Sequence, residues 1–209
     1  RDKGCDYDAV LFIPYLYATT ARALPIVAER SVLVGAFHDE PPLRLSIFDE
    51  VVDHAGAVVV STPEERQLAI RRFGVGNDRL HMVGAGIDFS ALSDGQPEAG
   101  FPGPVGGYVL SLGRIDASKG STDLIGLHRE YREHRPEGLD LVMIGRSVMD
   151  LPDYPWLHAP GFVDEPTKIG AIAGCTALVS ASPYESLSLV LLEAWAQGRP
   201  TLVTSRSDV

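Results

Sequence analysis

Two acidic side chains in one apolar segment are the strongest chemical signal in the sequence. Glu185 comes just before, and Glu193 lies within, a stretch whose apolar residues recur with the spacing of a helix. A carboxylate among apolar side chains is costly unless it is paired or hydrogen-bonded. The helix dipole favours an acid at a helix start, which accounts for Glu185 but not for Glu193. Glu193 therefore needs a partner, either a bound ligand or a local arginine.

The backbone between the two acids predicts an anion site. We expect the helix to begin near Ser186, so that the N–H groups of Ser186, Leu187 and Ser188 lack partners within the helix. Such N–H groups bind phosphate, and a carboxylate on either side can accept hydrogen bonds from sugar hydroxyls. With that helix start, Glu185 and Glu193 are about 12 Å apart along the helix. The arrangement suits a ligand made of a sugar, a diphosphate and a ribose.

A second polar segment, residues 110–120 (LSLGRIDASKG), follows an expected strand and leads into an expected helix. Gly113 permits a tight turn, and Arg114 and Lys119 can both reach the end of that strand. Arginine binds phosphate oxygens through two N–H groups and lysine adds a compact charge, so the pair suits a diphosphate. An ordinary exposed pair of basic residues explains the same pattern. The residues alone leave both interpretations open.

Two other motifs are rejected as binding sites. Residues 84–86 (GAG) could begin a dinucleotide-binding loop, but Phe89 stands where the third glycine is required and no helix pattern follows. His38, Asp39 and Glu40 are consecutive, and consecutive residues rarely converge on one metal ion. We therefore expect no metal and no cofactor. His38 is interpreted instead as a polar group directed into a cleft.

Composition excludes several classes of protein. The chain has 209 residues, of which 45% are hydrophobic, enough for one or two cores. A net charge of −10 argues against nucleic-acid binding and against a broad basic membrane face. Cys5 and Cys175 are too few for a disulfide framework, and the apolar runs are too short to span a membrane. We expect a cytoplasmic protein and leave a peripheral membrane contact open.

Short apolar runs alternate with helical patterns along the chain. Such alternation predicts parallel sheets with right-handed crossovers. Eight Gly or Pro residues within residues 94–107 predict a linker between two α/β layers. The expected strands are residues 8–14, 32–37, 57–61, 79–83, 108–112, 139–144, 177–180 and 200–204, and the expected helices are residues 19–30, 47–55, 63–73, 122–132, 166–173 and 186–197.

These segments resemble those of a known family. Residues 182–203 look like the Glu-x7-Glu segment of retaining family 4 glycosyltransferases, and residues 110–120 resemble their diphosphate loop. Residues 159–182 resemble the intervening base-binding stretch. The three segments follow the order of the family within residues 108–209. The first half is less similar, although residues 38–42 (HDEPP) resemble a cleft loop of a bacterial subgroup.

The resemblance implies a fold and an activity. The fold would be GT-B-like, with two Rossmann-like parallel-sheet domains, both incomplete in this chain, at residues 1–93 and 108–209 and a linker at residues 94–107. The activity would be transfer of a sugar, with retention, from a UDP- or GDP-sugar to a hydroxyl of a glycan, a lipid or a small molecule, as in polysaccharide biosynthesis. No metal or cofactor is implied. The isolated 209-residue piece is expected to be a poor catalyst.

The resemblance also implies roles for individual residues. Glu193 would hold the ribose hydroxyls, and Glu185 would hold hydroxyls of the transferred sugar. Arg114 and Lys119 would neutralise the diphosphate. His38 would face the sugar across the cleft. The remaining donor contacts would be Gly113 at the diphosphate turn, Phe162 and Val163 at the base, and the backbone of Ser186, Leu187 and Ser188.

One departure from the family affects the anion site. Ser186, Leu187 and Ser188 stand where many members have Gly-Phe-Gly. The backbone N–H groups remain, but the side chains narrow the approach of a ligand. A non-catalytic module that binds sugar nucleotides is the alternative left open. A GT-B phosphorylase or epimerase is disfavoured, because the pair of acids and the Arg/Lys pair occur together in the transferases.

Overall fold

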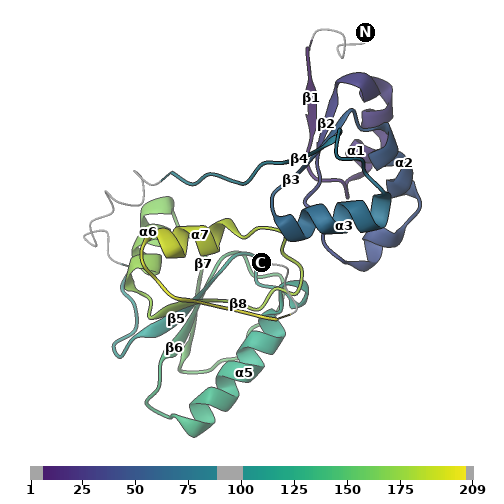
Figure 1. Cartoon of the computed structure of the whole chain (residues 1–209). Coiled ribbons are helices and arrows are strands. Elements are labelled where there is room, and N and C mark those ends of the chain that lie inside the picture. Colours follow the sequence, from purple (N-terminus) through teal and green to yellow (C-terminus); the bar gives the residue numbers. More distant parts are fainter. Residues whose placement is uncertain (1–6, 89–100, 206–209) are drawn as a thin grey trace. The chain divides into compact units, whose positions relative to one another are not determined.

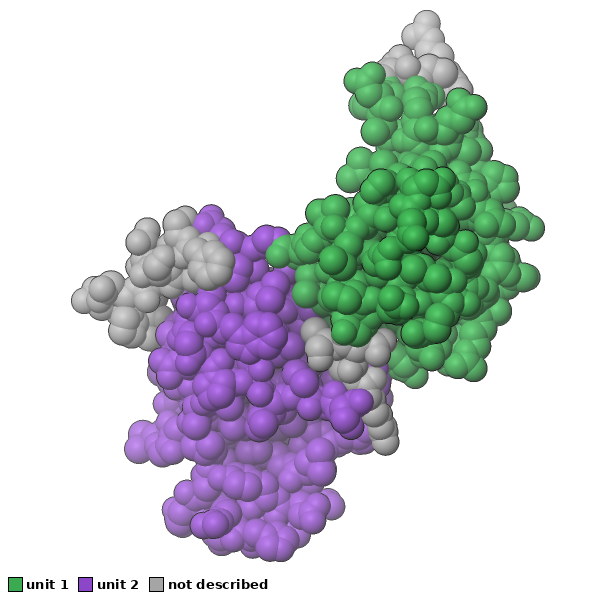
Figure 2. Space-filling view, viewed as in Figure 1, with its two compact units in different colours: residues 1–85, 184–187, 208–209 green, residues 86–183, 188–207 purple. Residues whose placement is uncertain are grey.

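A computed structural model describes residues 7–88 and 101–205. The chain divides into two compact units, each built on one parallel sheet (Figure 1 and Figure 2). Unit 1 comprises residues 1–85, 184–187 and 208–209, and unit 2 comprises residues 86–183 and 188–207. The predicted α/β class with two parallel sheets is confirmed. The predicted linker, residues 94–107, lies partly outside the described residues, and the predicted domain boundaries stay a prediction.

The sheet of unit 1 has four parallel strands in the order β1-β2-β3-β4. Leu33 of β2 aligns with Phe12 of β1 and with Val58 of β3. Leu33 and Val58 lie in the core of the unit, and Phe12 is partly buried and packs against that core. The strands are β1 (Val10–Phe12), β2 (Ser31–Val34), β3 (Ala57–Val60) and β4 (Leu80–Met82).

Local signals set the ends of the helices in unit 1. Thr62 caps the third α-helix, since its Oγ1 accepts a hydrogen bond from the Glu65 N–H at 3.2 Å, and Gly74 ends that helix with a φ of 66°. Pro25 divides the helix expected at residues 19–30 into an α-helical and a 3-10 part. The helical elements are α1 (Ala18–Ala23), η2 (Leu24–Arg30), η3 (Pro41–Arg44), α2 (Ile47–His54) and α3 (Pro63–Phe73).

The first two strands differ from prediction. Residues 8–14 are predicted to be buried on both faces, but Leu11 is 62% exposed and Ile13 is 61% exposed. Within the described residues, helices cover only the opposite face of this sheet. β2 is predicted to reach residue 37 but ends at Val34, because Ala36 adopts a left-handed φ of 50° that a strand does not permit.

The sheet of unit 2 has five parallel strands in the order β7-β6-β5-β8-β9. The chain adds β6 and β7 on one side of β5 and then returns to add β8 and β9 on the other side. The strand order therefore reverses between β5 and β8, and open α/β sheets bind ligands outside the carboxyl ends of their strands at such a point. β7 is not predicted, because its sequence LHAPG lacks an apolar run. The strands are β5 (Tyr108–Leu112), β6 (Asp140–Ile144), β7 (Leu157–Gly161), β8 (Ala177–Ser180) and β9 (Thr201–Val203).

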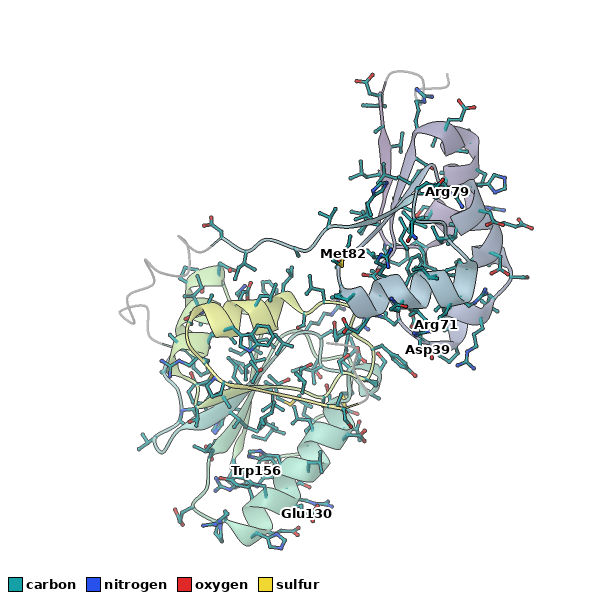
Figure 3. The ribbon with its side chains drawn as sticks, in the orientation of Figure 1. Asp39, Arg71, Arg79, Met82, Glu130 and Trp156 are labelled. Carbon is teal, nitrogen blue, oxygen red and sulfur yellow. The ribbon has the colours of Figure 1, made fainter. Side chains whose placement is uncertain are left out.

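Helices lie on both faces of this sheet. Figure 1 shows α6 and α7 on one face and α5 on the other. On the α7 face, Leu110 and Leu178 pack with Leu191. Near α5, Trp156 (Figure 3) stacks on Tyr154 with ring centroids 4.6 Å apart. The helical elements are η4 (Ala117–Lys119), α5 (Ser121–His134), α6 (Glu165–Gly174) and α7 (Leu189–Ala196).

Within the described residues, α5 covers only part of its face. A hollow of about 500 Å³ between α5 and β9 is lined mainly by apolar side chains, including Val109, Leu124 and Val179. β9 is predicted to be buried, but Leu202 is 61% exposed and Val203 is 42% exposed. No predicted ligand contact among the described residues lines this hollow. It is therefore an uncovered part of the sheet and not the expected binding site.

Gly120 is a position in unit 2 that requires glycine. Its φ is 73°, and an added Cβ would lie 2.1 Å from the Ala181 backbone oxygen. We predict that Gly120→Ala lowers the free energy of unfolding of unit 2 by about 3 kcal/mol or more, through backbone strain and this clash. The measurement is urea unfolding followed by tryptophan fluorescence, because Trp156 and Trp195 both lie in unit 2.

Gly198→Ala is the matched control for this substitution. Gly198 has a similar φ of 67°, but the described part of the chain has no atom within 4 Å of an added Cβ there. We expect Gly198→Ala to cost only the strain of the left-handed backbone, about 1 to 2 kcal/mol. An equal decrease in the free energy of unfolding of the two variants would show that the clash with Ala181 does not contribute to the effect.

Candidate functional site

The carboxyl edge of the sheet in unit 2 collects most of the predicted donor contacts. Because its strands are parallel, the segments that follow them all begin at this edge. Gly113 and Arg114 follow β5, while Phe162 and Val163 follow β7. Phe162 is 88% exposed, whereas Val163 packs against the core. Unit 2 contains Gly113, Arg114, Lys119, Phe162, Val163, Ser188 and Glu193, and unit 1 contains His38, Glu185, Ser186 and Leu187.

Asp116 organises the turn that carries the two predicted phosphate-binding side chains. Its carboxylate accepts hydrogen bonds from the Lys119 backbone N–H at 3.0 Å and from the Ser118 hydroxyl. It also forms an ion pair with Nε of Arg114. The Asp116 N–H donates to the Ser121 hydroxyl at 3.1 Å. Asp116 thus fixes the turn through both its carboxylate and its backbone N–H, and the carboxylate also holds the Arg114 guanidinium.

These bonds change the ionisation of Asp116. The Ser118 hydroxyl lowers its pKa most, partial desolvation opposes this, and Arg114 and the Lys119 N–H lower it further, to about 2. Sequence reasoning missed Asp116, although an aspartate three residues before a lysine in a turn is a common capping arrangement. The Arg114 side chain remains 57% exposed. It is therefore oriented by Asp116 and still open to a ligand from solvent.

The same turn packs against the segment that follows β8. The backbone of Gly120 touches that of Ala181, since an added Cβ would meet the Ala181 oxygen at 2.1 Å. Ala181 comes directly after β8, and Gly120 closes the turn after β5. This contact therefore lies at the point where the strand order reverses. The basic turn is thus located where such sheets bind their ligands.

A lysine pairs with Glu193. Nζ of Lys168 lies 3.0 Å from Oε1 of Glu193 and 2.7 Å from Oε1 of Glu165. Burial lowers the pKa of Lys168, but the two carboxylates outweigh burial and raise it. Oε2 of Glu193 is buried and has no hydrogen-bond partner within residues 7–88 and 101–205. A local cation therefore satisfies one oxygen of Glu193, a lysine in place of the expected arginine, and its contact with a ribose stays a prediction.

The helix that carries Glu193 begins later than predicted. α7 starts at Leu189, and Ser188 at its N-cap has extended backbone angles (φ −101°, ψ 106°). Ser186 and Leu187 therefore precede the helix, and the predicted start near Ser186 and the 12 Å helical span are wrong. Serine favours such non-helical positions because its hydroxyl competes for backbone hydrogen bonds. Predicted phosphate binding by the N–H groups of residues 186–188 would thus come from a loop.

α7 is also less buried than predicted. Leu191 and Ala194 lie in the core, but Leu189 is 48% exposed and Trp195 is 55% exposed. The Trp195 Nε1–H donates to the Thr201 hydroxyl at 3.0 Å. The apolar composition of this helix therefore does not mean burial on all sides. Within the described residues, one face packs on the sheet and the other stays partly open.

His38 lies in unit 1, in the loop between β2 and η3. Glu65 holds the start of this loop, because its carboxylate accepts hydrogen bonds from the Phe37 N–H at 2.9 Å and the Ser61 N–H at 2.7 Å. Burial raises the pKa of Glu65, and these backbone bonds oppose that effect. Sequence reasoning missed Glu65 as an anchor, although Thr62 and Glu65 have the spacing of a capping box. The direction of His38 toward a cleft stays a prediction.

The neighbours of His38 have partners of their own. Asp39 (Figure 3) forms an exposed ion pair with Arg44 at 3.3 Å, and Glu40 accepts a hydrogen bond from the Tyr15 hydroxyl at 3.0 Å. In the part of the chain that the structure describes, no three His, Cys, Asp or Glu side chains are placed to hold a metal ion. No helix of that part is long and apolar enough to cross a membrane.

We predict a pH-dependent stabilisation by Asp116. Its folded-state pKa lies below the ordinary value of about 4, so its contribution is complete above about pH 4 and is lost as the pH falls toward about 2. Asp116→Asn should lower the free energy of unfolding by about 1 to 2 kcal/mol near pH 6, after allowance for solvent screening. The difference should shrink below about pH 4. Urea unfolding of wild type and Asp116→Asn at a series of pH values measures this difference in the free energy of unfolding. A difference that does not vary with pH would contradict the prediction.

No family model matches the chain, but individual sequences do. Mannosylfructose-phosphate synthase of Agrobacterium fabrum is 28% identical over 171 residues, covering 70% of this chain and 37% of that protein. A D-inositol 3-phosphate glycosyltransferase of Paenarthrobacter aurescens is 26% identical over 191 residues, covering 83% of this chain and 47% of that protein. The chain thus spans less than half the length of these two relatives.

Solved structures show the same fold. Sucrose-phosphate synthase of Thermosynechococcus elongatus has a TM-score of 0.64 at 18% identity, covering 84% of this chain and 50% of that chain. A trehalose 6-phosphate synthase of Burkholderia multivorans has a TM-score of 0.65 at 16% identity, covering 86% of this chain and 54% of that chain. These likenesses confirm the predicted fold class. Together with the sequence relatives, they support the predicted resemblance to GT-B glycosyltransferases.

Proposed function

We propose that the chain binds a nucleoside diphosphate sugar, a UDP- or GDP-sugar, and belongs to an enzyme that transfers the sugar to a hydroxyl with retention of configuration. The observation that carries this proposal is the basic turn at the carboxyl end of β5. Asp116 holds the Arg114 guanidinium and the backbone N–H of Lys119 there, next to the backbone of Ala181 at the reversal of strand order. A diphosphate is the ligand group that this charge and position suit best.

The chemistry would depend mainly on electrostatics and positioning. Transfer breaks the bond between the anomeric carbon and a diphosphate oxygen, and the electron pair stays on the diphosphate. Arg114 and Lys119 would stabilise that growing negative charge with no reorganisation of the turn, because Asp116 already fixes it. The acceptor hydroxyl forms the new bond to the anomeric carbon, and its proton passes to the departing diphosphate oxygen.

The two acids would position the donor. A carboxylate accepts hydrogen bonds from vicinal hydroxyls, so Glu193 suits the ribose and Glu185 suits the transferred sugar. The buried Oε2 of Glu193, without a partner among the described residues, supports a role as acceptor of a ligand hydroxyl. Lys168 pairs with the other oxygen, Oε1, and so holds the carboxylate in place. A contact of His38 with the transferred sugar stays a prediction.

The relatives suggest a class of acceptor. Their names contain mannosylfructose phosphate and inositol 3-phosphate, which are a phosphorylated sugar and a phosphorylated polyol. We therefore include phosphorylated sugars and polyols among the proposed acceptors, beside glycans and lipids. A transfer assay with each class, following release of free UDP or GDP, identifies the acceptor. Because the 209-residue piece is expected to be a poor catalyst, the assay uses the whole protein, in which binding of the donor without any release would support the non-catalytic module.

We predict that loss of either basic side chain of the turn weakens binding of a nucleoside diphosphate. Arg114→Ala and Lys119→Ala should each raise the dissociation constant about tenfold or more, because each removes a charged hydrogen bond to phosphate. Isothermal titration calorimetry with UDP and GDP measures this. Increasing salt should weaken wild-type binding and should reduce the difference between wild type and variants.

Arg129→Ala is the matched control for these two variants. Arg129 is 58% exposed on α5 and pairs with Glu133, so its removal changes the net charge equally at a distance from the turn. The dissociation constants of UDP and GDP for Arg129→Ala should stay within about twofold of wild type. Equal weakening in all three variants would mean that only net charge matters, and unchanged binding in Lys119→Ala would refute the assignment of the turn.

A further inference from the structure

The sequence that ends β5 recurs at the end of β6. Gly113 and Arg114 follow β5, and Gly145 and Arg146 follow β6. Both glycines have positive φ values, 129° and 145°. An added Cβ on Gly145 would lie 1.9 Å from the Gly113 oxygen, so the two turns pack directly on each other. The first of these Gly-Arg turns belongs to the predicted diphosphate loop, and the second was not predicted to bind a ligand.

The hydrogen-bond ladder between the two strands continues beyond the glycines. The Ile115 N–H donates to the Arg146 oxygen at 2.9 Å, and Ile115 forms a parallel bridge with Ser147. Arg114 and Arg146 therefore occupy facing positions on neighbouring strands, about 5 Å apart in the hydrogen-bonding direction. Like charges at facing positions destabilise a sheet unless an anion compensates them. The two facing guanidinium groups are therefore stabilised by a nearby negative charge.

Among the residues that the structure describes, only one of the two arginines has that compensation. Arg114 pairs with Asp116, whose carboxylate is also engaged by Ser118 and Lys119. Arg146 is exposed and makes no side-chain hydrogen bond or ion pair with any residue that the structure describes. A strand end that places an exposed guanidinium beside a second arginine suits an external anion.

The strand order determines which part of a ligand Arg146 would meet. In the order β7-β6-β5, Arg146 lies between Phe162, which follows β7, and Arg114, which follows β5. The Gly145 N–H donates to the Gly161 oxygen at 2.9 Å, so the three strand ends adjoin one another. Two strand spacings amount to about 10 Å. A nucleotide whose base lies at Phe162 and whose second phosphate lies at Arg114 would place its first phosphate between them.

We propose that Arg146 binds the first phosphate of the nucleotide, the one attached to the ribose, while Arg114 and Lys119 bind the second. This inference rests on the proposed function and adds a phosphate contact to it. It assigns different cationic side chains to the two phosphates. The number of phosphates on a ligand should therefore decide which substitution affects its affinity.

The test compares ligands that differ only in their phosphates. Calorimetry on the whole 209-residue chain uses uridine, UMP and UDP, and in parallel guanosine, GMP and GDP. Arg146→Ala should raise the dissociation constants of the monophosphate and the diphosphate about tenfold each and leave that of the nucleoside unchanged. Lys119→Ala should raise the dissociation constant of the diphosphate about tenfold and that of the monophosphate less than about twofold. A purely structural role for Arg146 would weaken all three ligands alike.

Two further variants complete the test. Arg146→Lys keeps the charge and should recover part of the monophosphate affinity, whereas Arg129→Ala should bind all ligands like wild type. The inference would be overturned if Arg146→Ala bound the monophosphate as tightly as wild type. It would also be overturned if Arg146→Ala, like Lys119→Ala, lost affinity for the diphosphate alone. Either result would leave the proposed function in place. A wild-type chain that binds none of these nucleotides would overturn both.

Discussion

The close backbone contact of Gly120 with Ala181 is the constraint on which the candidate site depends. It joins the turn after β5 to the segment after β8, on either side of the reversal in strand order. Only glycine permits this contact, because both the left-handed backbone and the short distance exclude a side chain. The basic residues of the turn are therefore fixed by backbone packing before any ligand arrives.

Charge compensation is the second feature that the candidate groups share. Asp116 holds Arg114, and Lys168 holds Glu193. Each pair limits the cost of placing a charge near the protein interior, and each leaves a group available: the exposed guanidinium of Arg114 and the second carboxylate oxygen of Glu193. Such partial pairing is what a site for a charged, hydroxyl-rich ligand requires, because fully satisfied groups would gain little from binding.

The sequence predicted the fold class and most elements, because parallel strands and capped helices have strong local signals. Thr62 and Gly74 mark the ends of α3 as expected. The start of α7 was missed, since serines before a helix fit either its cap or its first turn. Exposure of Leu11 and Leu202 was also missed, because apolar content does not say which face is covered. Asp116 and Lys168 could not be identified, because their roles depend on contacts across turns and between helices.

The central claim is that the turn from Gly113 to Gly120 binds a diphosphate. A crystal structure of the chain with a bound nucleoside diphosphate tests it most directly. The account predicts phosphate oxygens within hydrogen-bonding distance of Arg114 and Lys119, at the carboxyl ends of β5 and β8. A nucleotide whose phosphates lie away from this turn, for example in the hollow beside α5, would contradict it.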